Sequence, residues 1–524
     1  MISLWFSGAQ AIAIKSPRNA CPSCSSDGST ILGSQNTIKI VSAVIAKKYK
    51  KWDSFLRITK SSFIIWTINI VKPIAIILPI MCLIILAPRP PRESESQLCV
   101  KTYEIFGPLH VVINCDSYEF VKLADNPALL LTDERSKLWQ SRPLYPVLGY
   151  FAAMPFKASG ILIQVGMSVI GIKGGMVIEA SGKSVNFNSV RYEIDDTAKS
   201  VVMAEGKSIN FSSMISGYLG YLTINMALLV IALIIFCRLL SNSSQISTWL
   251  IFPASLLLVN EVSKAFFWTP HLQIFNILYP ILTIGIGCKI IENRTIRLKK
   301  ILLIGMAIGV ACLIYGAFIV TAFSTAGALL IKQESNGKFW RSRVLPASCL
   351  LLATIVPILT WIGIVKLFCG SFYSHEIQVH RQFVWIFDAA RLGWVNFSTV
   401  ALANISTFYS MLAAVSIFPL LVLATVRISV SILQPKMLNI PLAQTRNIAS
   451  AMGCYFCAAI PFYALMGFHA TRLVWCLTVP LILLIAIDLR NIEANYKSRV
   501  PSLVSIIVTV LYIAFWTMSA GPYS

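Results

Sequence analysis

Long runs of apolar residues dominate the chain after its first sixty residues. Several runs exceed the ~18 residues that a helix needs to cross a bilayer. Their apolar positions are continuous and do not alternate, which is typical of membrane helices and not of a β-barrel. The pattern predicts an all-α polytopic membrane protein. The predicted spans lie near 61–87, 215–238, 246–260, 272–290, 301–331, 345–368, 398–425, 447–466, 472–488 and 502–520.

The stretch 301–331 decides how many times the chain crosses. It is either one long tilted helix or two short helices broken near Tyr315-Gly316. Lys and Arg collect in cytoplasmic loops, and only two crossings place Lys332 and Arg343 on the same side as Arg427. We therefore predict about 11 transmembrane helices, with the amino terminus in the cytoplasm and the carboxyl terminus outside.

Five regions follow from this topology. A polar, basic cytoplasmic tail precedes the first transmembrane helix, and a long outer segment divides into a loop and an insertion. A multi-span domain completes the chain. The boundaries are 1–60 for the tail, 61–87 for the first helix, 88–157 for the first outer loop, 158–213 for the insertion and 214–524 for the multi-span domain.

The long outer segment carries two different patterns. Residues 142–156, "RPLYPVLGYFAAMPF", are apolar but too short to span, which favours an amphipathic helix lying on the membrane surface. From Ile161 onward the chain is rich in Val and Ile, partly alternates, and is interrupted by Gly and Asn. That pattern predicts a small β-rich insertion over 158–213.

Composition supports the membrane class and limits the function. The chain is 56% hydrophobic and 13% charged, whereas soluble domains are about 25% charged. The mean hydropathy is +0.73. The net charge of +22 indicates cytoplasmic loops and contact with anionic lipids, and we expect no nucleic-acid partner.

Four segments on the predicted outer face hold an unusual number of polar residues. They lie at 113–146, 260–273, 370–385 and 466–473, and they contain four of the five histidines. Charged groups at span ends are expensive unless they are paired or functional, so their collection predicts a polar cleft at the outer boundary. The candidate binding residues are Arg142, Glu261, Lys264, His271, His380, Arg381, His469 and Arg472.

Motifs for other chemistries are missing. "HEIQVH" places its second histidine one residue too late for HExxH zinc spacing, so we predict no metal site. The segment "GIKGG" lacks the strand–loop–helix context of a phosphate loop, and no GxSxG elbow occurs. We expect no cofactor.

Several stretches together resemble the GT-C superfamily of membrane glycosyltransferases, which use polyprenyl-phosphate-linked sugars. They are "CDSYEF" after an early span, the helix opening "SRPLYP", "ADNPALLL", "FWTPHLQIFNILYP" and "RQFVWIFDAARLGW". The resemblance covers roughly 61–520 without the β-rich insertion. Family members commonly carry two adjacent carboxylates in the first outer loop, whereas here Asp116 is followed by Ser117 and the nearest partner is Glu119.

The resemblance implies sugar transfer from a polyprenyl-phosphate donor to a glycan or lipid acceptor. One carboxylate must take the proton from the acceptor hydroxyl, and we assign Asp116 as this base with Glu119 second. Cations must stabilise the leaving lipid phosphate, and Arg142, Lys264, Arg381 and Arg472 are the candidates. His271 and His380 are candidates for binding sugar hydroxyls or phosphate.

Three alternatives remain open. A transporter or flippase of lipid-linked sugars or polysaccharide has many spans too, but should show a repeat and mid-membrane polar residues. A ligase or polymerase using a lipid diphosphate has its large outer loop late in the chain, whereas here it is early. A non-catalytic assembly subunit is the third. We expect a multi-pass protein of the bacterial inner (plasma) membrane.

Overall fold

The computed structural model describes parts of the chain that all belong to the compact unit Ile68–Ser524. They are 100–106, 109–132, 139–169, 178–180, 183–185, 211–240, 250–293, 296–332, 340–433, 443–495 and 507–515. The predicted tail (1–60) and first transmembrane helix (61–87) lie outside these residues.

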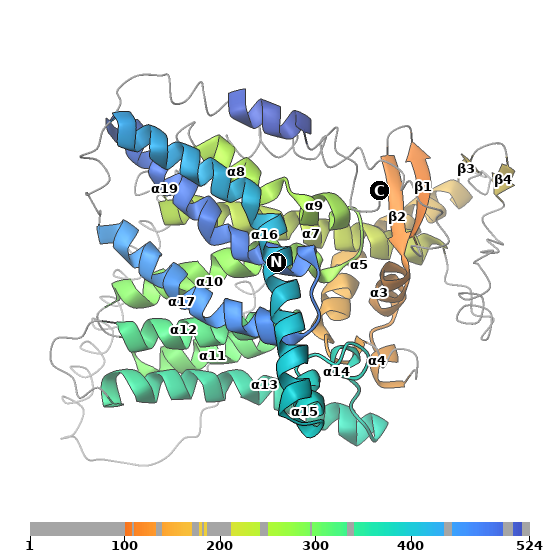
Figure 1. Ribbon diagram of the computed structural model, residues 1–524. Coiled ribbons are helices and arrows are strands. Elements are labelled where there is room, and N and C mark those ends of the chain that lie inside the picture. The colour runs from red at the N-terminus through yellow and green to blue at the C-terminus, as the bar shows by residue number, and fades with distance from the viewer. Residues whose placement is uncertain are drawn as a thin grey trace, which may run out of the picture. The chain divides into compact units, whose positions relative to one another are not determined.

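Six described helices are long and apolar enough to cross a membrane. Each coincides with a predicted span, which confirms a polytopic helical membrane protein. These spans are Ser216–Leu240, Leu272–Glu292, Ser342–Cys369, Trp394–Ser429, Thr445–Met466 and Thr471–Ile492. They are built on α7 (Phe211–Leu240), α10 (Phe275–Glu292), α13 (Leu345–Cys369), α16 (Trp394–Leu433), α17 (Ala443–Met466) and α19 (Val479–Asn495) (Figure 1).

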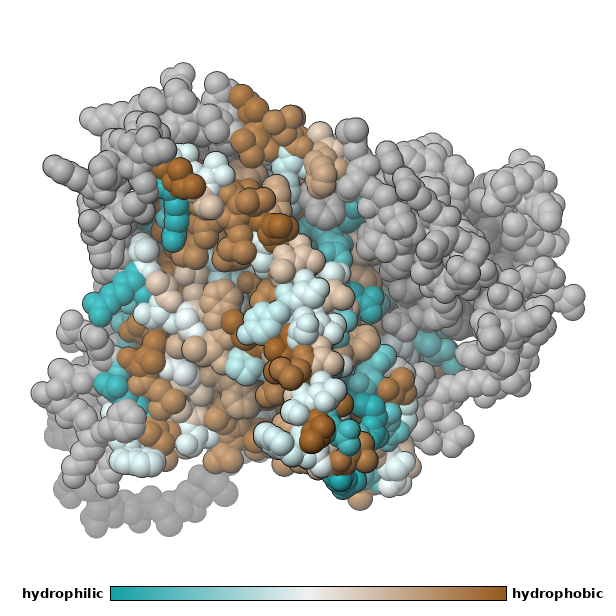
Figure 2. Space-filling model, viewed as in Figure 1, coloured by the Kyte–Doolittle hydropathy of each residue, from teal (hydrophilic) through white to brown (hydrophobic). Residues whose placement is uncertain are grey.

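Burial separates central helices from peripheral ones. The span around α10 is 72% buried, whereas the span around α16 is only 17% buried. Apolar residues such as Leu303, Leu352 and Leu402 are about two-thirds exposed, as expected for side chains that face lipid. Figure 2 shows hydrophobic residues over the middle of the described surface and hydrophilic residues toward its edges.

The predicted span 246–260 differs from the structure. Its described part is α8 (Ile251–Leu258), whose eight residues reach about 12 Å. The Asn260 side chain accepts hydrogen bonds from the backbone N–H groups of Val262 and Ser263 and starts a new helix, α9 (Glu261–Phe266). The eight described helical residues are too few to cross the ~30 Å hydrocarbon core, and residues 246–249 of the predicted span lie outside the described part.

The stretch 301–331 forms two helices, as the break near Tyr315 indicated. α11 (Leu298–Cys312) and α12 (Ile319–Ile331) are joined through a 3-10 turn, η5 (Gly316–Phe318). α11 runs parallel to α13, since a Cβ on Gly305 would meet Leu350 and one on Gly309 would meet Thr354. α12 runs back, because its Leu330 carbonyl accepts a bond from Arg343, in the π-helical turn η6 (Trp340–Val344) that precedes α13. The count of about 11 crossings remains a prediction.

The first outer segment is folded differently from its prediction. The interfacial helix does not stop near residue 156: α5 runs over Leu144–Val169, so residues 158–169 of the predicted β-rich insertion are helical. The Val and Ile content that suggested strands is a context-dependent preference, and the helix continues through it. The described part of 170–213 holds one hairpin, β3 (Ile178–Ala180) with β4 (Lys183–Val185), and the start of α7.

A second hairpin, β1 (Val100–Phe106) with β2 (Leu109–Asn114), lies within the predicted first outer loop. Its strands are rich in Val, Ile and aromatic residues, a strand signal that the prediction missed. Two helices follow, α3 (Cys115–Asp125) and α4 (Leu129–Thr132).

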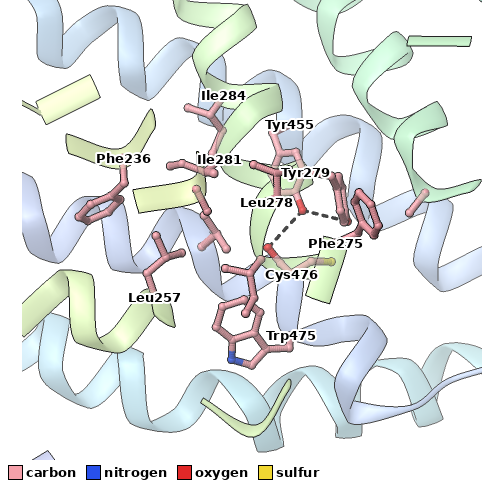
Figure 3. Packing of buried hydrophobic residues seen from close by; sticks show 14 of the residues in the cluster. Phe236, Leu257, Phe275, Leu278, Tyr279, Ile281, Ile284, Tyr455, Trp475 and Cys476 are labelled. Atoms are coloured by element: carbon pink, nitrogen blue, oxygen red, sulfur yellow. Dashed lines mark hydrogen bonds between the residues drawn. The ribbon is translucent and has the colours of Figure 1, made fainter. Parts of the chain in front are cut away.

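The core gathers where α10, α17 and the turn η8 (Trp475–Thr478) meet (Figure 3). The Tyr279 hydroxyl hydrogen-bonds those of Tyr455 (3.2 Å) and Tyr463 (2.7 Å). Tyr455 also donates to the carbonyl of Cys476 at 3.1 Å. These fully buried hydroxyls satisfy one another, which a buried polar group requires.

Candidate functional site

The first outer segment is fixed to the third by an ion pair. Arg142 precedes α5, and its guanidinium lies 2.5 Å from a carboxylate oxygen of Glu376. Glu376 belongs to a short helix, α14 (His375–Gln378). The two side chains are 23% and 19% exposed, so water screens the pair only partly.

Two hydroxyls complete the environment of Glu376. Ser141 donates to one carboxylate oxygen (3.3 Å) and Ser374 to the other (3.2 Å). Burial opposes ionisation of this carboxyl, but the Arg142 guanidinium, the backbone and both hydroxyls outweigh it and lower its pKa. Glu376 is therefore ionised at neutral pH.

Gln140 holds the Arg142 segment in place. Its backbone carbonyl accepts a 2.7 Å hydrogen bond from the Trp361 indole N–H of α13. Its side-chain amide donates to the carbonyl of Leu130 at 3.1 Å. Because Gln140 is 1% exposed, these bonds give the loop a defined position before Arg142.

The second and fourth segments are joined by direct polar contacts. The Thr471 hydroxyl donates to the Glu261 carboxylate. The Asn276 side chain donates to the backbone carbonyl of Arg472 (2.9 Å) and accepts a bond from the Tyr315 hydroxyl (2.8 Å). The turn between α11 and α12 therefore meets both segments at the start of α10.

Arg472 lies in α18 (Thr471–Val474), and its guanidinium carbon is 5.4 Å from the centre of the Phe266 ring. Its Nε is buried and has no hydrogen-bond partner among the described residues. The Tyr315 hydroxyl is linked to the Arg472 backbone through Asn276, and the N–H of Leu144, two residues after Arg142, donates to the carbonyl of Leu313 at 3.2 Å. The segments of both arginines therefore contact the turn between α11 and α12.

His271 also contacts the Phe266 ring. The two ring centres are 4.7 Å apart, and Nδ1 of His271 accepts a 3.2 Å bond from the backbone N–H of Gln273. His271 thereby caps a short 3-10 helix, η4 (Leu272–Ile274), that leads into α10. The predicted binding residues His271 and Arg472 therefore both contact the Phe266 ring.

The third and fourth segments pack along their backbones. The Phe383 N–H donates to the carbonyl of Met466 (3.2 Å), and the His380 ring lies 4.4 Å from that of Phe468. Arg381 and Phe383 have φ of 50° and 61°, the left-handed region that costs most residues energy. The segment then continues as α15 (Val384–Arg391).

Arg381 and His469, two further predicted binding residues, have different surroundings. Arg381 forms an ion pair with Asp388 of the following helix, α15, and its side chain is 55% exposed. The His469 ring lies 5.8 Å from that of Phe408, and neither ring nitrogen forms a hydrogen bond among the described residues. Burial lowers the His469 pKa more than the Asn404 backbone raises it.

The predicted carboxylates lie on α3. Asp116 is its second residue, in the turn where a helix dipole favours negative charge, and the position of its side chain lies outside the described part. Glu119 is partly buried. The next residue, Phe120, packs on Trp139 and Tyr145 with ring centres 4.3 and 4.8 Å apart. The helix thus adjoins the Arg142 segment.

Lys264 and Glu261 both belong to α9. Lys264 is partly buried, and Glu261 accepts the bond from Thr471 described above. Among the described residues, no group of three or more His, Cys, Asp and Glu side chains is placed to hold a metal ion.

Several residues of the arrangement were not predicted. Two of them, Asn276 and Tyr315, lie inside apolar runs, where a polar side chain needs a partner. Asn276 inside "FNILYP" and Tyr315 at the break of 301–331 carried that signal. The unpredicted residues are Gln140, Ser141, Asn276, Tyr315, Ser374, Glu376 and Thr471.

No family model, no curated protein and no solved structure matches the chain.

Proposed function

We propose that the chain is a membrane glycosyltransferase that moves a sugar from a polyprenyl-phosphate donor to a glycan or lipid-linked acceptor. The observation that carries the proposal is that the segments of Arg142 and Arg472 both contact the turn that holds Tyr315, next to the carboxylate-bearing helix α3. A lipid phosphate needs cations at the membrane boundary, and the acceptor needs a base.

In the proposed reaction the acceptor hydroxyl oxygen forms a bond to the anomeric carbon of the sugar. The bond from that carbon to the phosphate oxygen breaks, and its electrons leave with the lipid phosphate. Asp116 takes the acceptor proton, and Glu119 lies one helical turn away as the second candidate.

Arg472 is the stronger candidate for binding the phosphate. Its Nε is buried without a described partner, and a guanidinium binds two phosphate oxygens through its planar fork. Arg142 is held by Glu376. A phosphate that approaches it must compete with that carboxylate, so donor binding and the Arg142–Glu376 contact oppose each other.

Arg381 is the weaker candidate among the predicted cations because Asp388 already neutralises it in an exposed position. His469 is favoured in its neutral form, since burial lowers its pKa. A neutral ring can donate to or accept from a sugar hydroxyl.

The proposed location is a bacterial plasma membrane with the site on its outer face, where soluble nucleotide sugars are not expected. A transporter or flippase of lipid-linked sugars is the alternative. It would bind the same donor but would leave the bond between sugar and phosphate intact.

The test is sugar transfer from radiolabelled polyprenyl-phosphate sugars by the purified full chain in nanodiscs. We expect Asp116→Asn to lower transfer by about 100-fold or more, since a general base contributes 10²–10⁴-fold. Asp125→Asn is the matched control: it removes a carboxylate of the same helix that is paired with Lys157 at 2.6 Å. Full transfer by Asp116→Asn would move the base to Glu119, and no transfer by wild type with any donor would favour the transporter.

A further inference from the structure

A cavity of about 450 Å³ opens among α7, α10 and α11. It lies away from the candidate site. The site residue Asn276 is at the first turn of α10, whereas the cavity residues Lys289 and Glu292 are at its last turn.

The cavity combines apolar walls with a basic rim. It extends along α11 from Lys300 to Ala311, a rise of about 17 Å. Phe318 ends it on the side of the candidate site, with its ring about 6.0 Å from those of Phe275 and Tyr279. The apolar wall residues include Ile235, Leu239, Leu282, Ile286, Ile304 and Ile308.

Three cations and one carboxylate lie at the rim. Arg238 lies in the last turn of α7, Lys289 in the last turn of α10 and Lys300 in the first turn of α11. Glu292 pairs with Lys289 at 2.8 Å. The rim therefore keeps a surplus of positive charge, carried by side chains that are exposed.

We infer that this cavity is a binding site for an anionic phospholipid. The phosphate of its head group meets the cations of the rim, and an acyl chain lies along the apolar wall. A free phosphate ion would not contact the apolar wall. A zwitterionic lipid such as phosphatidylcholine carries a cationic group beside its phosphate, which offsets the attraction to the rim. Basic pockets between membrane helices bind anionic head groups in this way.

The test measures lipid affinity of the delipidated full chain in detergent by native mass spectrometry. The probes are dioleoyl-phosphatidylglycerol, dioleoyl-phosphatidylcholine and glycerol 3-phosphate. We expect one phosphatidylglycerol to bind at least ten-fold more tightly than phosphatidylcholine, and glycerol 3-phosphate not to displace it. The pair Lys289→Gln with Lys300→Gln should weaken that affinity about 25-fold, from about five-fold per cation.

The matched control is the pair Arg297→Gln with Lys299→Gln. These residues are exposed neighbours of the rim that do not line the cavity, and their removal should change affinity less than two-fold. Ala307→Trp, which fills the apolar wall, should weaken both lipids. Equal affinity for the two lipids, equal loss in both charge pairs, or displacement by glycerol 3-phosphate would overturn the inference.

Discussion

Removal of the Glu376 carboxylate tests whether the ion pair with Arg142 holds the first and third outer segments together. Glu376→Gln keeps the shape of the side chain and one oxygen that can accept from a serine hydroxyl, while the other serine must accept from the new NH2 group. The substitution leaves the Arg142 guanidinium without its counter-ion. Exposed ion pairs contribute about 0–1 kcal/mol, and breaking a fully buried pair costs about 3–5 kcal/mol. With side chains about one-fifth exposed, we expect a loss of about 2 kcal/mol.

The pH dependence follows from the lowered pKa of Glu376. A carboxyl whose folded pKa is below its unfolded pKa stabilises the fold above the unfolded value, here 4.5, and that contribution is lost as pH falls through the folded pKa. Wild type should therefore lose stability below about pH 4.5 through this group, whereas Glu376→Gln should lack that component. The difference between the two proteins should shrink as the pH falls.

The assay is thermal unfolding in detergent at pH 7 and at lower pH, with Asp388→Asn as the matched control. Asp388 pairs with Arg381 in a more exposed position, so its removal should cost under about 1 kcal/mol. A cycle that combines Glu376→Gln with Arg142→Gln isolates the pair, because residues in contact are not additive. Equal losses in the Glu376 and Asp388 variants, with no coupling to Arg142, would refute the reasoning.

Three further predictions concern the helices around the site. Gly309→Val should destabilise by about 1–3 kcal/mol, since its Cβ would lie 2.3 Å from a backbone oxygen of α13, and Gly363→Val, with open space, should cost less in the same unfolding assay. Asn225→Ala should cost about 1–3 kcal/mol, because its buried amide donates to three carbonyls including that of Phe267. His469→Gln should remove an acid-sensitive step: the lowered pKa makes folding lose stability as pH falls below 6.5, and pH-dependent unfolding measures it.

The sequence predicted the membrane helices well because hydrophobic length is a local signal. The six long spans depend on composition alone, and the break at Tyr315 was visible as a Gly within an apolar run. The predicted span 246–260 is helical over 251–258, and it ends there because Asn260 caps a new helix, a signal that only one side chain carries. The prediction of a β-rich insertion was wrong for residues 158–169, which are helical, because β-branched content does not decide between helix and strand without tertiary context.

The sequence predicted which four segments hold the polar residues, but not which of their side chains pair with one another. Charged residues near span ends pointed to one face, and contacts now join the four segments that carried them. Which cation is paired depends on packing between residues over two hundred positions apart, as for Arg142 with Glu376. Sequence spacing carries no information on such a pair. Arg381 and Arg472 also looked equivalent in the sequence, although in the structure Arg381 forms an ion pair with Asp388 and the buried Nε of Arg472 has no hydrogen-bond partner among the described residues.

The proposed sugar-transfer site and the proposed lipid site use cations at opposite ends of α10. Arg142 and Arg472 lie near its start, and Lys289 and Lys300 lie near its end. Between them Tyr279 is fully buried, and the hydroxyls of Thr283 and Thr321 bond to each other at 2.7 Å. Asn276 and Lys289 are separated along α10 by a rise of about 20 Å, so the two proposed ligands occupy different positions. Lys289→Gln with Lys300→Gln should weaken lipid binding and leave sugar transfer intact. If transfer fell as well, the two ends would share one substrate path, as a transporter requires.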